Sequence, residues 1–176
     1  MNNSIRPDHI QSFYPVLRCA PNAEASITGS DAYPAIRGKA LFYQTSLGIL
    51  VSVWVFGLPT DRDSYSAPFF AFHLHSGTAC TGDSEDAFRD ALTHYNPKDC
   101  LHPNHTGDFP PLLANHGMAF SVFLTDRFSV DEIIGKTVII HADPDDFTTQ
   151  PSGNAGTKIA CGQIRRNRCC GRSFFL

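Results

Sequence analysis

The chain reads IRGKALFYQTSLGILVSVWVF from Ile36 to Phe56, a stretch dominated by β-branched and aromatic residues. Such residues favour extended strands. Between the two apolar runs, Thr45-Ser-Leu-Gly48 has the length and the glycine of a tight turn. We therefore predict a β-hairpin whose strands cover residues 36–44 and 49–56.

Runs of the same character recur farther along the chain, whereas helical patterns are scarce. Further strands are predicted at residues 69–75, 118–125, 137–141 and 158–164. Helix is expected only at residues 86–92 and in one turn opened by the capping box Ser129-Val-Asp-Glu132. Short strands with irregular connections and little helix are typical of an all-β antiparallel sandwich.

The composition narrows the class of protein. The chain has 176 residues, of which 42% are hydrophobic, and a formal net charge of −3. These values suit one globular domain and argue against a protein that binds nucleic acid or a membrane surface. We expect a flexible tail at residues 1–31, the domain at 32–165, and a basic, cysteine-containing tail at 166–176. The start of the chain shows no secretory signal, which favours a cytoplasmic location over the cell surface or a non-standard export route.

The strand predicted at residues 69–75 carries two histidines, His73 and His75. Residues two apart on a strand point to the same face, and two adjacent imidazoles form half of a site for copper or zinc. The pair alone is weak evidence, because two histidines on an exposed strand face more often have no ligand role. His141 lies at the end of another predicted strand. Taken alone, it could equally be a metal ligand or a simple surface residue.

A second group of metal-ligand residues lies in the long segment 76–117. This segment is rich in glycine and proline, and irregular segments of such length inside a compact domain are usually functional. It contains His94, His102, His105 and Asp108. Three neutral imidazoles and one carboxylate make an N₃O ligand set that suits tetrahedral zinc. The sequence therefore predicts a zinc site in this loop.

Taken in order, these residues resemble the ligand pattern of the copper–zinc superoxide dismutases. The resemblance covers residues 35–165 and extends to the residues around the ligands. Cys80 lies five residues after His75, and this spacing resembles that of the bacterial-type branch of the family. The matching motifs are Phe72-His-Leu-His75, His94-Tyr-Asn-Pro97, His105-Thr-Gly-Asp108, Gly153-Asn-Ala-Gly156 and Ala160-Cys-Gly162.

The resemblance implies a Greek-key β-sandwich, a flattened and immunoglobulin-like barrel, with long metal-binding and electrostatic loops. It implies one copper and one zinc ion that share His94 as a bridge. It also implies that Asp145 hydrogen-bonds to one ligand of each metal, and that Cys80 and Cys161 form a disulfide. The implied copper ligands are His73, His75, His94 and His141. The implied zinc ligands are His94, His102, His105 and Asp108.

The activity that this resemblance implies is the disproportionation of superoxide. Two superoxide anions give dioxygen and hydrogen peroxide as copper cycles between Cu(II) and Cu(I), and His94 donates a proton to the forming peroxide. Where the family has an arginine, this chain has Lys158, which keeps the charge that attracts an anion but lacks the planar head group. The implied partners are superoxide, a second copy in a homodimer, and a copper-donor protein.

Other functions stay open at this point. A non-catalytic relative would keep the fold and bind copper and zinc for buffering or for structure. A copper-delivery protein would use Cys169 and Cys170, although the cysteine motif usual in copper chaperones is absent. A zinc hydrolase would need an open position on its zinc, which His94 would close. The sequence predicts no role for Cys19 or Cys100.

Overall fold

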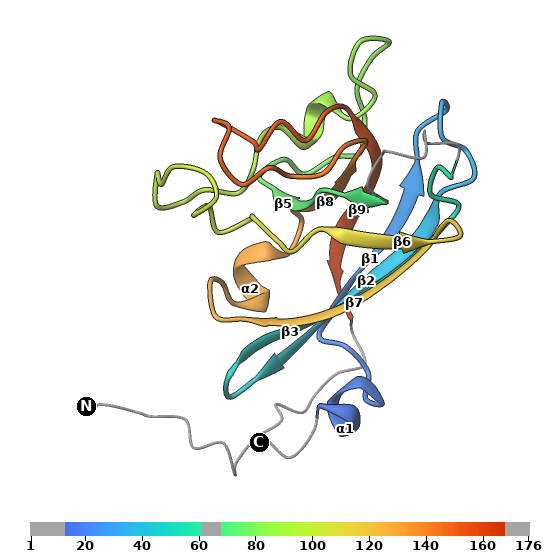
Figure 1. Ribbon diagram of the computed structural model, residues 1–176. Helices are drawn as coiled ribbons and strands as arrows, with labels where there is room; N and C mark the ends of the chain where they lie inside the picture. Colours follow the sequence, from blue (N-terminus) through green and yellow to red (C-terminus); the bar gives the residue numbers. More distant parts are fainter. Residues whose placement is uncertain (1–12, 61–67, 168–176) are drawn as a thin grey trace.

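The computed structural model describes residues 13–60 and 68–167 (Figure 1). Within these residues, nine strands form one sheet in the order β4-β6-β7-β3-β2-β1-β9-β8-β5, and every neighbouring pair is antiparallel. The strands are β1 Ala23–Gly29, β2 Arg37–Thr45, β3 Gly48–Phe56, β4 Phe69–Phe70, β5 Phe72–His75, β6 Leu112–Asn115, β7 Met118–Thr125, β8 Thr137–His141 and β9 Lys158–Arg166. The short helices are α1 Tyr14–Leu17, η2 Arg89–Ala91 and α2 Val130–Ile133.

The sheet curls into a nearly closed barrel. Strands β4 and β5 lie at opposite edges of the sheet, yet only Ala71 separates them in the chain. The two edges therefore come together, as Figure 1 shows for β6 and β5. The prediction of an all-β antiparallel fold is confirmed.

The predicted hairpin is confirmed as β2 and β3, with Thr45 paired to Gly48 across the turn. Alternate residues of β3, Val51, Val53 and Val55, are fully buried and point into the barrel. Side chains on successive strand residues alternate between faces, so this pattern fixes which face of the hairpin meets the core.

Part of the outer face of the hairpin is covered as well. Val16 of α1 packs with Tyr43 and Leu50 in a separate buried cluster. This contact explains why β3 is apolar on both faces near its turn. No helix among the described residues is long and apolar enough to cross a membrane.

The expected tail at residues 1–31 is wrong for Ala23–Gly29, which form β1. This strand lies between β2 and β9 and buries Ala23, Ala25 and Ile27. Two of these three inward residues are alanines, which give only a weak apolar alternation in the sequence, so the strand was not predicted. Residues 1–12 and 168–176, the outer parts of both expected tails, lie outside the described residues.

Four smaller predictions also differ from the structure. The strand expected at 69–75 is interrupted at Ala71, and the helix expected at 86–92 is only the turn η2. Strand β6 lies within the segment that was expected to be irregular. The final strand continues to Arg166, two residues beyond its predicted end.

Two long loops among the described residues, 76–111 and 142–157, lie on the side of the barrel away from α1 (Figure 1). The first loop is tied to β9 by the predicted disulfide between Cys80 and Cys161, which are 81 residues apart in sequence. Closing a loop of that size stabilises a fold by about 4.5 kcal/mol in the chain-entropy description. The site described next is built from these loops and from β5 and β8.

Candidate metal centre

Strands β5 and β8 carry three of the predicted ligands. His73 and His75 lie on β5, opposite Ile139 and Thr137 of β8. His141 ends β8, just after an irregularity in its pairing with β9. All three histidines are buried. The pairing of β5 with β8 and of β8 with β9 fixes the backbone of each.

The first loop returns to the free edge of β5 and brings in two more ligands. His94 forms a bridge with His75, and Asp108 forms a bridge with His73. Between them, Leu74 donates its amide to the carbonyl of Gly107 at 2.9 Å. A Cβ atom at Gly107 would lie 2.1 Å from the carbonyl oxygen of Leu74, so only glycine allows the loop this close.

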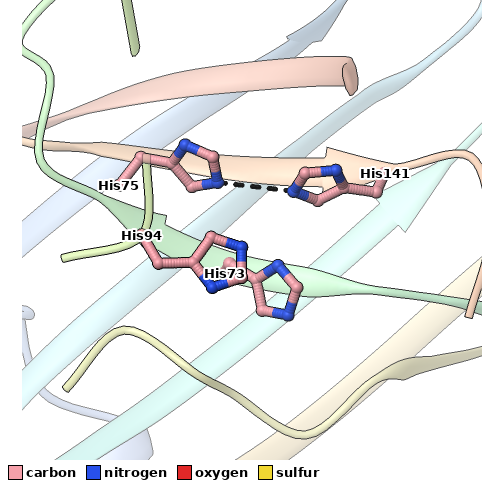
Figure 2. Close-up of side chains that lie close together, drawn as sticks. All are labelled: His73, His75, His94 and His141. Atoms are coloured by element: carbon pink, nitrogen blue, oxygen red, sulfur yellow. Dashed lines mark hydrogen bonds between the residues drawn. The ribbon is translucent and has the colours of Figure 1, made fainter. Parts of the chain in front are cut away.

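His73, His75, His94 and His141 form what we call the four-histidine cluster, shown in Figure 2. His75 Nδ1 lies 2.9 Å from the carbonyl oxygen of Leu92, and His141 Nδ1 lies 3.2 Å from that of Gly156. A ring nitrogen next to a carbonyl oxygen must carry the proton. The Nε2 atoms of both rings therefore present lone pairs.

These two lone pairs face each other across 3.3 Å, the contact drawn as a dashed line in Figure 2. Two acceptors cannot hydrogen-bond to each other, and a neutral imidazole with a free lone pair is the form that ligates a metal. His75 and His141 are therefore arranged for a cation between them.

Three further buried nitrogens support this interpretation. Among the described side chains, His73 Nδ1, His94 Nε2 and His102 Nδ1 are buried without a hydrogen-bond partner. Such atoms are rare in folded proteins because an unpaired buried polar group is costly. Each belongs to a ligand group, so metal ions fit the residues that are present.

His94, His102, His105 and Asp108 form what we call the mixed cluster, because it combines imidazoles with a carboxylate. His94 Nδ1 lies 2.8 Å from Asp108 Oδ1 and 3.3 Å from His105 Nδ1. His102 Nδ1 lies 3.2 Å from Asp108 Oδ2. His94 thus turns Nδ1 toward the mixed cluster and keeps Nε2 for the four-histidine cluster.

Asp145 links the two clusters by hydrogen bonds to one histidine of each. Its Oδ2 accepts a hydrogen bond from His73 Nε2 and its Oδ1 accepts one from His102 Nε2, both at 2.9 Å. Burial would raise the pKa of Asp145, but the hydrogen bonds from His73, the Phe147 amide and His102 outweigh it and lower the pKa to about 2. The carboxylate fixes the protonated nitrogen of each ring and leaves Nδ1 free to ligate.

Burial also lowers the pKa values of His73, His75 and His141. It is the main cause that lowers the pKa of His141 to about 3 and the pKa of His75 well below 6.5, and neighbouring imidazoles lower both further. Burial likewise lowers the pKa of His73, although its hydrogen bond to Asp145 opposes the shift. These rings are neutral at pH 7, the state that binds metal.

A pocket of about 700 Å³ opens over the four-histidine cluster, lined in part by His75, His94, His141 and Lys158. The Lys158 ammonium donates to Asp86 Oδ2 at 2.7 Å and to the carbonyl oxygen of Phe88 at 3.1 Å. The predicted anion-attracting lysine is thus at the pocket, but it lies in an ion pair that the sequence did not reveal.

Two other residues that hold the mixed cluster were also not predicted. The side-chain amide of Gln150 donates to the carbonyl oxygen of His102 at 2.7 Å and accepts from its amide at 3.0 Å. Arg127 donates to the carbonyl oxygen of His105 at 2.9 Å. Neither residue belongs to a sequence motif. Each forms hydrogen bonds with the backbone of a residue that is distant in the sequence. Cys19 and Cys100 are free thiols.

Comparisons with known proteins agree with this geometry. The family model for copper/zinc superoxide dismutase matches residues 36–164. A copper–zinc superoxide dismutase of Aquifex aeolicus is 32% identical over 143 residues, which is 73% of this chain and 78% of the relative. One of Legionella pneumophila is 29% identical over 157 residues, 85% of this chain and 90% of the relative.

The fold has a counterpart among solved structures. The copper/zinc superoxide dismutase of Brucella abortus superposes with a TM-score of 0.65 at 21% identity, covering 80% of this chain and 98% of that one. At this identity the likeness concerns the fold. It places the curled sheet of this chain in the same architecture.

Proposed function

The chain belongs to the copper/zinc superoxide dismutase family, and we propose that it disproportionates superoxide with one copper and one zinc ion at the two clusters. The observation that carries this proposal is the position of His94. It is the one residue common to both clusters, with Nδ1 in the mixed cluster and a buried, unpartnered Nε2 in the four-histidine cluster. An imidazole whose two ring nitrogens face different clusters can bind one ion with each nitrogen.

The ligand chemistry assigns one ion to each cluster. An all-imidazole set suits copper, so His73, His75, His94 and His141 would hold it. The N₃O set of the mixed cluster suits zinc. Bound copper supplies one-electron redox chemistry, and zinc, which has none, supplies charge and order.

The side chains around the ligands keep the rings in the required state. The carbonyl oxygens of Leu92 and Gly156 hold the Nδ1 protons of His75 and His141, and Asp145 holds the Nε2 proton of His73. No ring can then turn its protonated nitrogen toward the ion. This fixed protonation keeps the ligating nitrogens of His73, His75 and His141 available to an ion.

His94 is the proton donor in this proposal. Its ring lines the pocket through which a small anion reaches the four-histidine cluster. When Nε2 is not bound to an ion it could carry a proton inside the buried site, and His94 could pass that proton to the reduced substrate as a general acid. The overall balance is two superoxide anions and two protons to one dioxygen and one hydrogen peroxide.

Lys158 provides positive charge at the pocket. An ammonium has three N–H donors, and Asp86 and Phe88 take two of the three. The remaining donor and the charge favour a small anion over a neutral molecule. A second copy of the chain and a copper-donor protein stay predictions. Sedimentation of the pure protein would test the first of them.

The direct test is superoxide dismutation by protein loaded with one copper and one zinc per chain. We expect fast turnover that needs copper and is absent from the zinc-only protein. The complete set of copper ligands disfavours a non-catalytic metal-binding protein. Stoichiometric binding of both metals without turnover would contradict the proposal and favour that alternative.

A further inference from the structure

At the pocket, the ammonium of Lys158 is paired with the carboxylate of Asp86. The ammonium is 2.7 Å from Asp86 Oδ2, and the side chains of Lys158 and Asp86 are 15% and 34% exposed. Both residues line the same pocket as His141. The pair is partly buried, so solvent screens it less than a pair on the open surface.

Asp86 is held in place by the turn around it. Its Oδ1 accepts the amide of Phe88 at 3.0 Å, and its carbonyl oxygen accepts the amides of Asp83 and Arg89 at 3.0 and 3.1 Å. The packing is close, because a Cβ atom at Gly82 would lie 2.0 Å from that carbonyl oxygen. The carboxylate is therefore a fixed partner for Lys158.

The state of the carboxylate suits this role. Burial would raise the pKa of Asp86, but the hydrogen bond from Lys158 and the amide of Phe88 outweigh it and lower the pKa. Asp86 is thus negative at pH 7. Its charge cancels much of the field that the ammonium would otherwise project into the pocket.

We infer that Asp86 is a positioning residue and counter-ion for Lys158, and that this pair sets how strongly the pocket takes up small anions. The inference rests on the proposed function, because the anion must reach the four-histidine cluster. It goes beyond that function by proposing that Asp86, in the 76–111 loop, lowers the affinity of the pocket for anions. The charge of Lys158 is attenuated, and a neutral residue at position 86 should release it.

The test uses azide as a small anionic probe of protein loaded with copper and zinc, followed by visible absorption. Asp86→Asn keeps an oxygen acceptor for Lys158 and removes the charge. We expect azide affinity to rise roughly threefold to tenfold at low salt, and the gain to shrink at high salt. The dismutation rate of this variant should also fall more steeply with added salt.

Two comparisons show whether the effect acts through Lys158. Glu85→Gln removes an equal charge from the same loop and pocket lining, but Glu85 pairs with Arg89. We expect this control to raise azide affinity by less than half as much. In a Lys158→Gln background, Asp86→Asn should raise the affinity by much less than in the native protein, because the partner whose charge it releases is gone.

A measurement without copper separates this inference from the proposed function. In zinc-only protein, amine acylation resolved by mass spectrometry should label Lys158 faster in Asp86→Asn, with Lys136 unchanged as the internal reference. Unchanged azide affinity in Asp86→Asn, an equal gain in Glu85→Gln, or an equal gain without Lys158 would each overturn the inference. If copper gave no azide response in any variant, the labelling of Lys158 would decide.

Discussion

The four-histidine cluster and the mixed cluster share His94 but are supported by different parts of the molecule. Three of the four histidines in the first lie on strands β5 and β8. The remaining ligands of the mixed cluster all lie in the 76–111 loop, which has no strand between η2 and β6. One half of the centre is thus part of the barrel, whereas the other is attached to it.

The supports differ in kind. Strand ligands are placed by a backbone ladder that exists whatever side chains surround it. Two of the loop ligands depend on individual side chains, because Gln150 and Arg127 bond to the carbonyl oxygens of His102 and His105. We conclude that substitutions away from the ligands should disturb the mixed cluster more readily than the four-histidine cluster.

The largest effect is expected where the two halves meet. His94→Ala removes a ligand from both clusters, and the Nε2 proton with it. We expect dismutation to fall by roughly 10²-fold or more, beyond the loss typical for supporting residues, and zinc affinity to fall with it. Rates and bound metals would be measured on the same preparations. Full zinc binding by this variant would show that His94 is not shared.

The next effect comes from the residue that spans both halves without binding a metal. Asp145→Asn offers one acceptor where His73 and His102 need two. We expect about 10- to 100-fold weaker binding of both metals, measured by competition with chelators. Asp146→Asn is the matched control, because the hydrogen bonds that the Asp146 carboxylate accepts come from the turn at Thr148 and Thr149. A loss confined to one metal would break the link that we assign to Asp145.

Acid should destabilise the metal-free protein through the strand-held half. His141 has its pKa lowered to about 3 in the folded protein, whereas the unfolded chain takes up that proton near pH 6.5. Stability is therefore complete above pH 6.5 and is lost as the pH falls toward 3, by at most about 1.4 kcal/mol per pH unit for each such histidine. His75, shifted in the same direction, adds to this loss.

Urea unfolding at pH 7 and pH 5 would measure this loss. The control is His116→Asn, at an exposed histidine whose φ of 51° asparagine tolerates. This variant should have the same pH dependence as the native protein. Equal unfolding midpoints at the two pH values would contradict the burial of the neutral rings.

The smallest effect should be selective. Gln150→Ala removes two hydrogen bonds to His102, each worth about 1 kcal/mol, and part of that loss is recovered by water. We expect zinc affinity to fall severalfold while copper affinity stays unchanged. Gln163→Ala, which removes bonds to Thr78 and Gly135 outside the centre, is the control. Equal losses of copper and zinc would contradict the separate support of the two halves.

The same division explains what could be predicted from the sequence. The hairpin β2–β3 and the pair His73 and His75 follow from the period of a strand, which is local. Strand β1 was missed because Ala23 and Ala25 carry little apolar signal. The candidate ligands of the mixed cluster were predicted from their residue types and order, and the structure brings them together.

Apart from Asp145, which the family resemblance implied, the supporting residues could not be found in that way. Asp86 meets Lys158 from 72 positions away, and Gln150 meets His102 from 48. Both are ordinary polar loop residues, and nothing in their neighbours marks them. Only the packing of the two loops on the barrel reveals these contacts.

The central claim is that His94 binds one ion with each ring nitrogen. Diffraction from crystals of the copper- and zinc-loaded protein, collected at the absorption edges of both metals, tests it most directly. We expect a copper peak beside His94 Nε2 among His73, His75 and His141, and a zinc peak beside His94 Nδ1. Both metals in one cluster, or a His94 ring in contact with only one ion, would contradict it.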